Sequence, residues 1–175
     1  MCRFASMILT RDRAFWSRGT DSHDEIIAEF GLVDEVAGRI TLARIELTPP
    51  GEDSTAPLDQ WVYVLDQDLL PEWYEPAETE RRARVCLVEV CAARLFTTDE
   101  HQVTAGIYVA CDSAQVTAYN SAQVTARDSA QVKAYGSATV LQWGGTVDLS
   151  DLAACVDRRG GNPVFRVASE GSTPR

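Results

Sequence analysis

The most regular alternation of hydrophobic and polar positions lies in residues 113–144, where four tandem copies of eight residues follow one another. In the first three copies Ala, Val and Ala occupy positions two, four and six between polar neighbours, which places them on one face of a strand. The eighth position holds Asn120, Asp128, Gly136 or Gly144, residue types that tolerate a left-handed backbone. Each octad therefore predicts a short strand followed by a turn.

Stacked octads predict a short parallel β-solenoid, because a repeated strand-and-turn unit buries its apolar face only against neighbouring copies. The interior of such a coil is thin and flattened, since alanine and valine are small. Residues 105–112 form an atypical first copy that ends in Asp112. An antiparallel meander of hairpins is the alternative that the same spacing allows.

The number of octads in each coil stays open on the sequence alone. Two octads per coil place Tyr119 beside Tyr135 for ring stacking and Arg127 beside Trp143 for a cation–π contact. Three octads per coil pair Tyr119 with Trp143 instead. These four side chains are the candidate surface residues of the solenoid. A short solenoid also has exposed ends, so self-association into a homodimer or larger homo-oligomer is a further expectation.

Residues 1–100 carry a different pattern, which predicts an α+β unit of about four strands and two helices. The expected strands are residues 4–10, 14–17, 39–47 and 61–65. Taken with the octads, this pattern divides the chain into an acidic α+β domain over residues 1–100 and a solenoid domain with a C-terminal cap over residues 101–175.

Both expected helices have recognisable ends. The first covers residues 21–31, because Ser22 with Glu25 three residues later is a capping box and Gly31 is placed to end the helix. The second covers residues 77–96, with acids early and an arginine late, as the helix dipole favours. Its expected apolar face consists of Val88, Cys91 and Leu95.

The formal net charge of −10 is concentrated in the N-terminal part. Residues 1–100 hold 20 Asp and Glu against 10 Lys and Arg, whereas residues 101–175 hold 6 against 6. Residues 46–80 contain ten acids and no Lys or Arg. Such a surface repels phosphate, so direct binding to nucleic acid is not expected, and a protein partner with a basic surface is its natural complement.

Aromatic side chains lie among these acids. The candidate binding residues combine both kinds, and they are Asp59, Asp66, Asp68, Glu72, Trp73, Tyr74 and Glu75. Carboxylates mixed with aromatic rings can imitate the phosphates and bases of nucleic acid, or dock into an arginine-rich groove. The alternative is a solvated acidic loop beside a favourable helix start, with Trp61 and Tyr63 half-buried in a sheet.

The sequence offers few residues for catalysis or metal binding. The five cysteines are an odd number without framework spacing and are expected to be reduced thiols, and no metal or cofactor site is predicted. His23 belongs to the first turn of a capped helix, where we expect it to face solvent. Cys2 becomes an N-terminal nucleophile if Met1 is removed, which makes an N-terminal-cysteine hydrolase the alternative function. The interpretation preferred for Cys2 is a small residue at the start of a core strand.

The octad Ser-Ala-Gln-Val-Thr-Ala-Tyr-Asn resembles arrays in uncharacterised phage and prophage proteins. Segments similar to residues 21–27, 45–50 and 61–63 occur there in the same order before the repeats, so the resemblance covers most of residues 1–144. It implies an origin in a phage or mobile element, where small acidic proteins commonly bind and block host machinery. It carries over no catalytic residue.

Together these features predict a cytoplasmic, non-enzymatic protein that binds another protein. The sequence contains no apolar run long enough for a transmembrane helix and no pattern of a secretory signal. The expected activity is inhibition of a host defence complex, or of another nucleic-acid-binding complex, by an acidic mimic, in the manner of an anti-CRISPR protein. The alternatives are the N-terminal-cysteine hydrolase and a structural, self-assembling solenoid protein.

Overall fold

The computed structural model describes residues 5–168 and divides into two compact units, Met1–Ala93 and Arg94–Arg175. A region of helix and strands followed by a β-solenoid of about four turns confirms the fold class predicted from the sequence. Each unit has a hydrophobic core of its own. Among the described residues, no helix combines the length and the apolar composition needed to cross a membrane.

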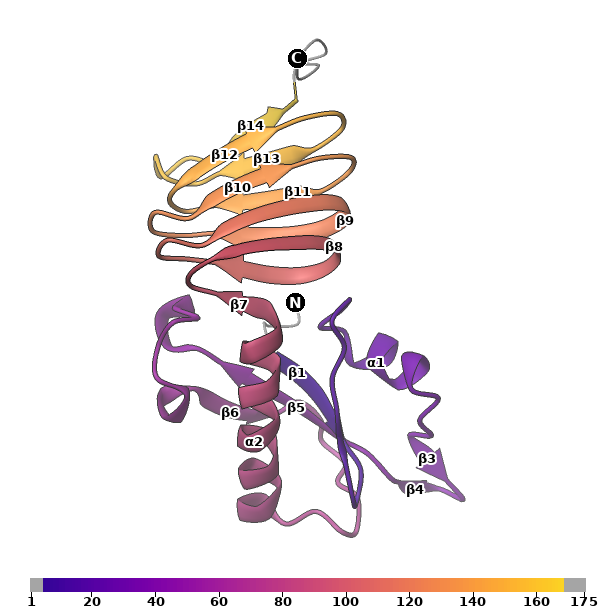
Figure 1. Cartoon of the computed structure of the whole chain (residues 1–175). Helices are drawn as coiled ribbons and strands as arrows, with labels where there is room; N and C mark the ends of the chain where they lie inside the picture. Colours follow the sequence, from indigo (N-terminus) through magenta and orange to yellow (C-terminus); the bar gives the residue numbers. More distant parts are fainter. Residues whose placement is uncertain (1–4, 169–175) are drawn as a thin grey trace. The chain divides into compact units, whose positions relative to one another are not determined.

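A four-stranded antiparallel sheet forms the centre of the N-terminal unit, with strand order β2, β1, β5, β6 (Figure 1). The strands are β1 (Ala5–Leu9), β2 (Ala14–Phe15), β5 (Ala43–Thr48) and β6 (Val62–Leu65). Alternation along β5 buries Ala43, Ile45 and Leu47 on one face and leaves Arg44 and Glu46 half-buried on the other. The two faces of the sheet therefore meet different neighbours.

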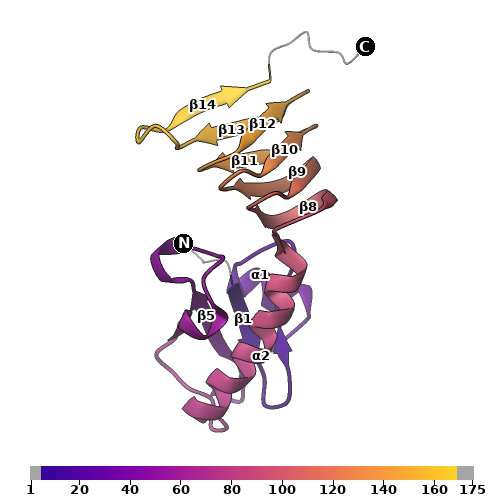
Figure 2. The same ribbon diagram turned by 60° about the vertical axis from the view of Figure 1, so that its left-hand side comes forward.

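Helix α2 (Pro76–Arg94) covers the face that carries Ile45 (Figure 2). The helix itself was predicted, but only Cys91 of its predicted apolar face is buried in this core, because Val88 is 55% exposed and Leu95 lies beyond the last helical residue. The buried stripe is instead formed by Ala83, Leu87 and Val90, again at spacings of three and four. The helix is apolar on more than one side, so periodicity alone does not select the side that faces the sheet.

Helix α1 (His23–Glu29) lies against the opposite face of the sheet, where Ile8, Ile26 and Leu42 form a small core. Its predicted cap is confirmed, since the Ser22 side chain accepts a hydrogen bond from the backbone N–H of Glu25. Gly31 follows the helix with a left-handed backbone, φ 60°. The helix is short, and packing on the sheet stabilises it.

The single strand expected over residues 39–47 is wrong, because the chain breaks it in two. A small hairpin pairs β3 (Glu35–Val36) with β4 (Arg39–Ile40), and β5 begins only at Ala43. Two further short 3-10 turns, η1 (Pro50–Glu52) and η2 (Leu58–Gln60), lie between β5 and β6. In the break, the carbonyl of Thr41 accepts a hydrogen bond from the Trp73 indole and its backbone N–H donates to the Asp34 carbonyl.

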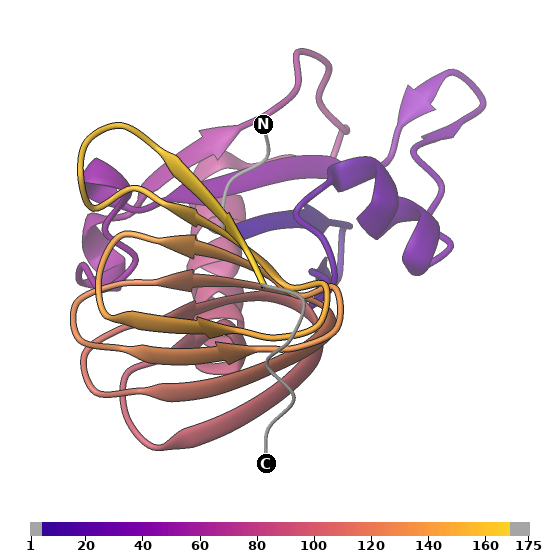
Figure 3. The same ribbon diagram turned by 90° about the horizontal axis from the view of Figure 1, so that it is seen from above.

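The second unit stacks its strands in parallel, one coil above the next. The strands are β7 (Leu95–Phe96), β8 (Glu100–Ala110), β9 (Gln115–Ala126), β10 (Gln131–Ala134), β11 (Thr139–Gln142), β12 (Thr146–Leu149), β13 (Ala154–Asp157) and β14 (Val164–Val167). Gln131 pairs with Gln115 and Thr139 with Gln123, an offset of sixteen residues, so each coil takes two octads. The coils form flattened loops with strands along two sides (Figure 3).

Local rules of the octad determine the interior and corners of the coil. The interior positions of the second and third octads are at most 2% exposed, and they are Ala122, Val124, Ala126, Ala130, Val132 and Ala134. The corners take a left-handed backbone at the eighth position, with φ of 49° at Asp112, 51° at Asn120, 50° at Asp128 and 63° at Gly136. Serines tie neighbouring coils together, because Ser129 Oγ donates to the Asp112 carbonyl and Ser137 Oγ to the Asn120 carbonyl.

The corner at Gly144 differs from the expected one, because Gly145 and not Gly144 has the left-handed backbone, φ 66°. Thr146 pairs with Gln131 at an offset of only fifteen residues, so this corner is one residue shorter than the corner beneath it. The shorter corner approaches the backbone below closely: a Cβ on Gly144 would lie 2.5 Å from the Asp128 nitrogen. A Cβ on Gly145 would lie 1.9 Å from the Ala130 oxygen, so neither position accepts a side chain without a shift.

Strand β14 ends the described part of the solenoid by pairing antiparallel with β13. Arg166 on β14 donates through Nη2 to Gln142 Oε1 and lies 3.3 Å from Cys155 Sγ. Gln142 is 1% exposed, and its Nε2 donates to the Gly145 carbonyl at 2.8 Å. A cluster of polar side chains thus closes this end of the coil interior, although the buried Nε of Arg166 has no hydrogen-bond partner within the described residues.

Candidate functional site

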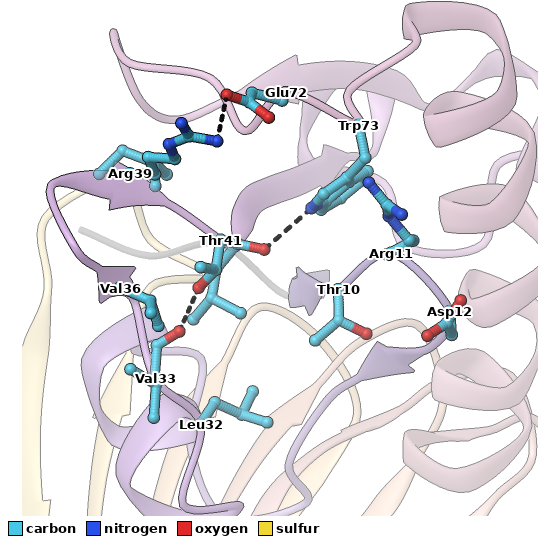
Figure 4. A pocket seen from close by; sticks show the side chains of 12 residues that line it. Thr10, Arg11, Asp12, Leu32, Val33, Val36, Arg39, Thr41, Glu72 and Trp73 are labelled. Atoms are coloured by element: carbon cyan, nitrogen blue, oxygen red, sulfur yellow. Dashed lines mark hydrogen bonds and ion pairs between the residues drawn. The ribbon is translucent and has the colours of Figure 1, made fainter.

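A pocket of about 530 Å³ lies in the N-terminal unit beside Trp73 (Figure 4). Apolar side chains form much of its lining, and they are Leu32, Val33, Val36, Ile40, Leu42 and Trp73. Charged side chains of both signs complete it, and they are Arg11, Asp12, Arg39 and Glu72. The β3–β4 hairpin supplies Val36 and Arg39, so the pocket depends on the hairpin that replaces the continuous strand.

Trp73 is held in place from two directions. Its indole Nε1 donates to the Thr41 carbonyl at 3.0 Å, and the Thr41 hydroxyl donates to the Val33 carbonyl (Figure 4). The ring also packs against the core between α2 and the sheet. Because its half-buried indole is held by a hydrogen bond and by core contacts, Trp73 forms a fixed wall of the pocket.

An ion pair lies at the edge of the pocket, where Arg39 Nη1 approaches Glu72 Oε1 to 3.0 Å. The two side chains are 70% and 72% exposed, so solvent screens the attraction and the pair contributes little to stability. Either group is therefore free to exchange its partner for a charge on another molecule at small cost.

The other candidate binding residues do not converge on this pocket. Asp59 and Asp68 are exposed elsewhere on the unit, and Asp66 lies beside His23. Glu75 Oε2 accepts the backbone N–H of Glu78 at 2.7 Å, so this carboxylate caps the start of α2. The Tyr74 hydroxyl meets that of Tyr63 at 3.4 Å, and burial together with this contact raises the pKa of Tyr63.

Arginines from outside residues 46–80 neutralise part of the acidic run. Arg81 pairs with Glu78 at 2.6 Å and lowers the pKa of that carboxyl, and Arg84 pairs with Glu80 at 2.7 Å. With the Arg39–Glu72 pair, three acids of the run thus have arginine partners. The surface formed by residues 46–80 is therefore less negative than the sequence of this segment alone suggests.

His23 is buried, which overturns the expectation that it faces solvent. The residue is 5% exposed, and its ring contacts the edge of β5, where Nε2 lies 3.1 Å from the Ile45 carbonyl. Nδ1 lies 3.2 Å from Asp66 Oδ2. The first turn of α1 therefore faces the sheet, a fact that depends on packing between distant segments and has no local sequence signal.

The solenoid candidates lie at the corners of the coils. Tyr119 and Tyr135 stack with ring centroids 5.3 Å apart and an interplanar angle of 20°, the contact expected of two octads per coil. The Arg158 guanidinium lies over the Trp143 ring at 5.5 Å, and the sequence did not single out this residue. These contacts join neighbouring segments of the coil and stabilise it.

Cys2 lies outside the described residues, so its role as a nucleophile stays a hypothesis. The cysteines within them, Cys86, Cys91, Cys111 and Cys155, are buried. Burial, with the Glu89 carboxylate nearby, raises the pKa of Cys86 to about 12, so this thiol is protonated at neutral pH and a poor nucleophile.

Comparisons with protein-family models, with curated proteins and with solved structures found no match for this chain. The functional argument therefore depends on the geometry of the two units.

Proposed function

We propose that this chain is a non-enzymatic protein that binds a basic protein partner through its N-terminal unit. The partner that we propose is a host complex that itself binds nucleic acid, and binding inhibits it. The observation that carries the binding function is the pocket beside Trp73, where an apolar lining of rigid side chains adjoins exposed carboxylates. No comparable argument supports catalysis within the described residues.

The pocket suits the anchor residue of a protein partner. Binding energy at protein interfaces concentrates where a side chain of one partner fills a well-packed apolar pocket of the other. Val36 and Leu32 line the pocket and Trp73 is fixed by its hydrogen bond, so little ordering is needed when an apolar side chain enters.

The charges around the pocket favour a basic partner. Glu72 is 72% exposed in its side chain, and Asp12, the other acid that lines the pocket, is also exposed. An arginine or lysine of the partner replaces Arg39 on Glu72 at small cost, because the existing pair is solvated. Proteins that bind nucleic acid present such basic surfaces, whereas nucleic acid itself is repelled by the net charge of −10.

The origin and the target that we propose follow from the resemblance of the octads and of the segments before them to phage and prophage proteins. A phage or mobile element benefits from blocking a host defence complex, and an acidic protein is suited to the basic groove of such a complex. This part of the proposal depends on what phage proteins commonly do, and no binding or catalytic residue is carried over from them.

An affinity pull-down with the tagged full-length chain from a bacterial host lysate, at low and at high salt, tests the proposal. We expect one stoichiometric nucleic-acid-binding protein that elutes as the salt concentration rises, because charge pairs at an interface rim are screened. The affinity of this partner is then measured for the purified wild-type chain and for a variant that combines Asp12→Lys with Glu72→Lys, which should lose binding.

The matched control carries the same change of charge on the solenoid, where Glu100 and Asp148 are both exposed. Glu100→Lys combined with Asp148→Lys should leave the affinity within about twofold, since most surface substitutions away from an interface are nearly neutral. If both double variants bind equally well, the acidic pocket is not the binding site.

Self-association through the end of the solenoid is a second candidate, favoured by one observation. Exposed apolar side chains gather at the last strands, where Val164, Phe165 and Val167 are 57%, 77% and 74% exposed. Strand β14 ends its sheet within the described residues and offers an unpaired edge. Light scattering on the full chain should then give a homodimer that Phe165→Lys with Val167→Lys converts to a monomer. A wild-type monomer would contradict this candidate.

A further inference from the structure

Three potential metal-ligating side chains from separate segments meet on the α1 face of the N-terminal sheet. His23 is the first residue of α1, Glu46 lies on β5, and Asp66 follows β6. One ligand atom from each side chain lies within 4.8 Å of the others. The three residues are far apart in the sequence, so only the fold brings them together.

The hydrogen bonds of His23 fix which ring nitrogen carries a proton. Nε2 lies 3.1 Å from the Ile45 carbonyl, and a carbonyl oxygen only accepts, so Nε2 donates. Nδ1 of a neutral imidazole then presents a lone pair, and the atom that it faces at 3.2 Å is Oδ2 of Asp66, which also only accepts when ionised. Such a contact requires either a proton on one of the two atoms, such as a second ring proton, or a metal ion between them.

Glu46 distinguishes these two cations. Its side chain is half-buried, and within residues 5–168 its carboxylate forms no hydrogen bond or ion pair with another side chain. A second ring proton would satisfy only Asp66, and would leave Glu46 without a partner. A metal ion accepts ligands from His23 and from both carboxylates at once, and neutralises two negative charges beside an imidazole whose side chain is only 6% exposed.

We propose that His23, Glu46 and Asp66 bind a divalent transition-metal ion of the zinc class. One imidazole nitrogen and two carboxylate oxygens are ligands that zinc takes readily, whereas calcium and magnesium prefer sites built only from oxygen. The Nε2–H bond to the Ile45 carbonyl is the outer interaction that typically orients a metal-bound histidine. Asp66 is 55% exposed, so the remaining coordination positions are open to water or to a fourth ligand from a partner.

This site is independent of the protein-binding function proposed above, although Asp66 belongs to the same acidic segment. Metal binding is measured on the isolated chain, without a partner, so failure of one proposal leaves the other intact.

Titration of the metal-free full-length chain with Zn²⁺, in competition with a chromophoric chelator, measures the affinity. We expect one equivalent to bind to the wild type. Asp66→Asn and Glu46→Gln should each weaken binding by at least about tenfold, because even loss of an outer-shell partner costs that much. Their folding is verified by circular dichroism, since neither change removes a buried core contact.

The other histidine supplies the matched control. His101 lies in the solenoid, where its ring stacks on Phe96 with centroids 3.9 Å apart and Nε2 lies 2.8 Å from the Thr98 carbonyl. His101→Gln should keep the wild-type affinity, whereas His23→Gln should abolish binding. Co²⁺ as a second probe separates these ligands from cysteine, since thiolate ligands add a charge-transfer absorption that nitrogen and oxygen ligands lack.

Three outcomes would overturn the proposal: no bound zinc in the wild type, unchanged affinity in both carboxylate variants, or a thiolate band with Co²⁺. The first would leave the His23–Asp66 contact as a direct interaction between the two side chains. Because His23→Gln also removes the bond to Ile45 and can disturb folding, the two carboxylate variants decide the outcome.

Discussion

The two units solve the problem of a hydrophobic core in different ways. In the N-terminal unit, side chains as different as Met7, Trp61 and Leu87 interlock between a sheet and a helix, and each position has its own neighbours. In the solenoid, Ala and Val repeat at the same interior positions, and each coil meets only the coils above and below it. One core depends on contacts between distant segments, and the other on a local rule applied many times.

The two units also differ in the functional groups that they present. The solenoid presents outward rows of Gln and Thr and a capped end, whereas the N-terminal unit holds a buried histidine, a rigid pocket and most of the charge. Irregular packing produces unequal environments, and unequal environments are what binding sites require. The experiments proposed next disturb one unit while the other serves as its reference.

The largest expected change in the free energy of unfolding comes from substituting a glycine, and it is predicted by comparing two glycines with the same left-handed backbone. A Cβ on Gly31, after α1, would meet no atom within 4 Å, whereas a Cβ on Gly145 would lie 1.9 Å from the Ala130 oxygen. That oxygen also accepts the Thr146 N–H at 2.9 Å, so the ladder holds it in place. Gly31→Ala should cost about 1 kcal/mol of backbone strain, and Gly145→Ala at least about 3 kcal/mol.

Urea unfolding of the full chain measures both costs, and hydrogen exchange assigns each to a unit. Gly145→Ala should lower the hydrogen-exchange protection of amides in the solenoid, and Gly31→Ala that of amides in the N-terminal unit. If both variants lost the same free energy of unfolding, the corner at Gly144 and Gly145 would have to relax around the new side chain. The prediction based on the short distance to Ala130 would then be wrong.

An effect of intermediate size is expected in the pH dependence of the free energy of unfolding, and its source is Cys86 in the core of the N-terminal unit. Burial raises the pKa of its thiol from 9.0 to about 12, so the folded chain keeps a proton that the unfolded chain loses. The resulting stabilisation is complete below about pH 9 and declines as the pH rises toward 12, by at most about 1.4 kcal/mol per pH unit. Unfolding free energies of the wild type and of Cys86→Ala between pH 7 and 11 measure this decline.

The difference between the two proteins should shrink in alkali, and exchange protection should fall first in the N-terminal unit. If the difference in unfolding free energy between the two proteins stayed constant with pH, Cys86 would not be the cause of the alkaline loss of stability. The thiol should also resist modification at neutral pH until the unit unfolds.

The smallest effect tests the winding of the solenoid. Tyr119 and Tyr135 stack across neighbouring coils, so a double-mutant cycle with alanine should give a coupling of about 0.5–1.5 kcal/mol. The control cycle joins Tyr119 with Trp143, the pair that three octads per coil would bring together. That coupling should lie within about 0.5 kcal/mol of zero, and the reverse ranking would contradict the two-octad coil.

The sequence predicts what short-range rules control. Octad spacing, the left-handed corners at Asn120 and Asp128, and the Ser22 cap of α1 are decided by neighbours a few residues away. These features were correct from the sequence alone. The corner at Gly144 was not, because its shape depends on the approach of the corner beneath.

The missed features all depend on long-range contacts. At the break in the expected strand, Thr41 bonds to the distant Trp73 indole, and the choice of the buried side of α2 requires the sheet beneath it. Burial of His23 depends on β5 and Asp66 in the same way. The pocket and the cluster around His23 are built from such contacts. The sequence therefore supplied single members, namely Glu72, Trp73 and Asp66, but could not show which residues they meet.

The sixteen-residue offset between stacked strands also constrains how the gene can change. Nearly identical tandem octads are prone to gain or loss of copies during replication. Removing one octad would move the strands above it to the opposite side of the coil, so that the tyrosine corner would meet the corner of Arg127 and Trp143. Removing two would shorten the stack by one coil and leave each side in line. The length of this solenoid is therefore expected to evolve in steps of two octads, with its ends preserved.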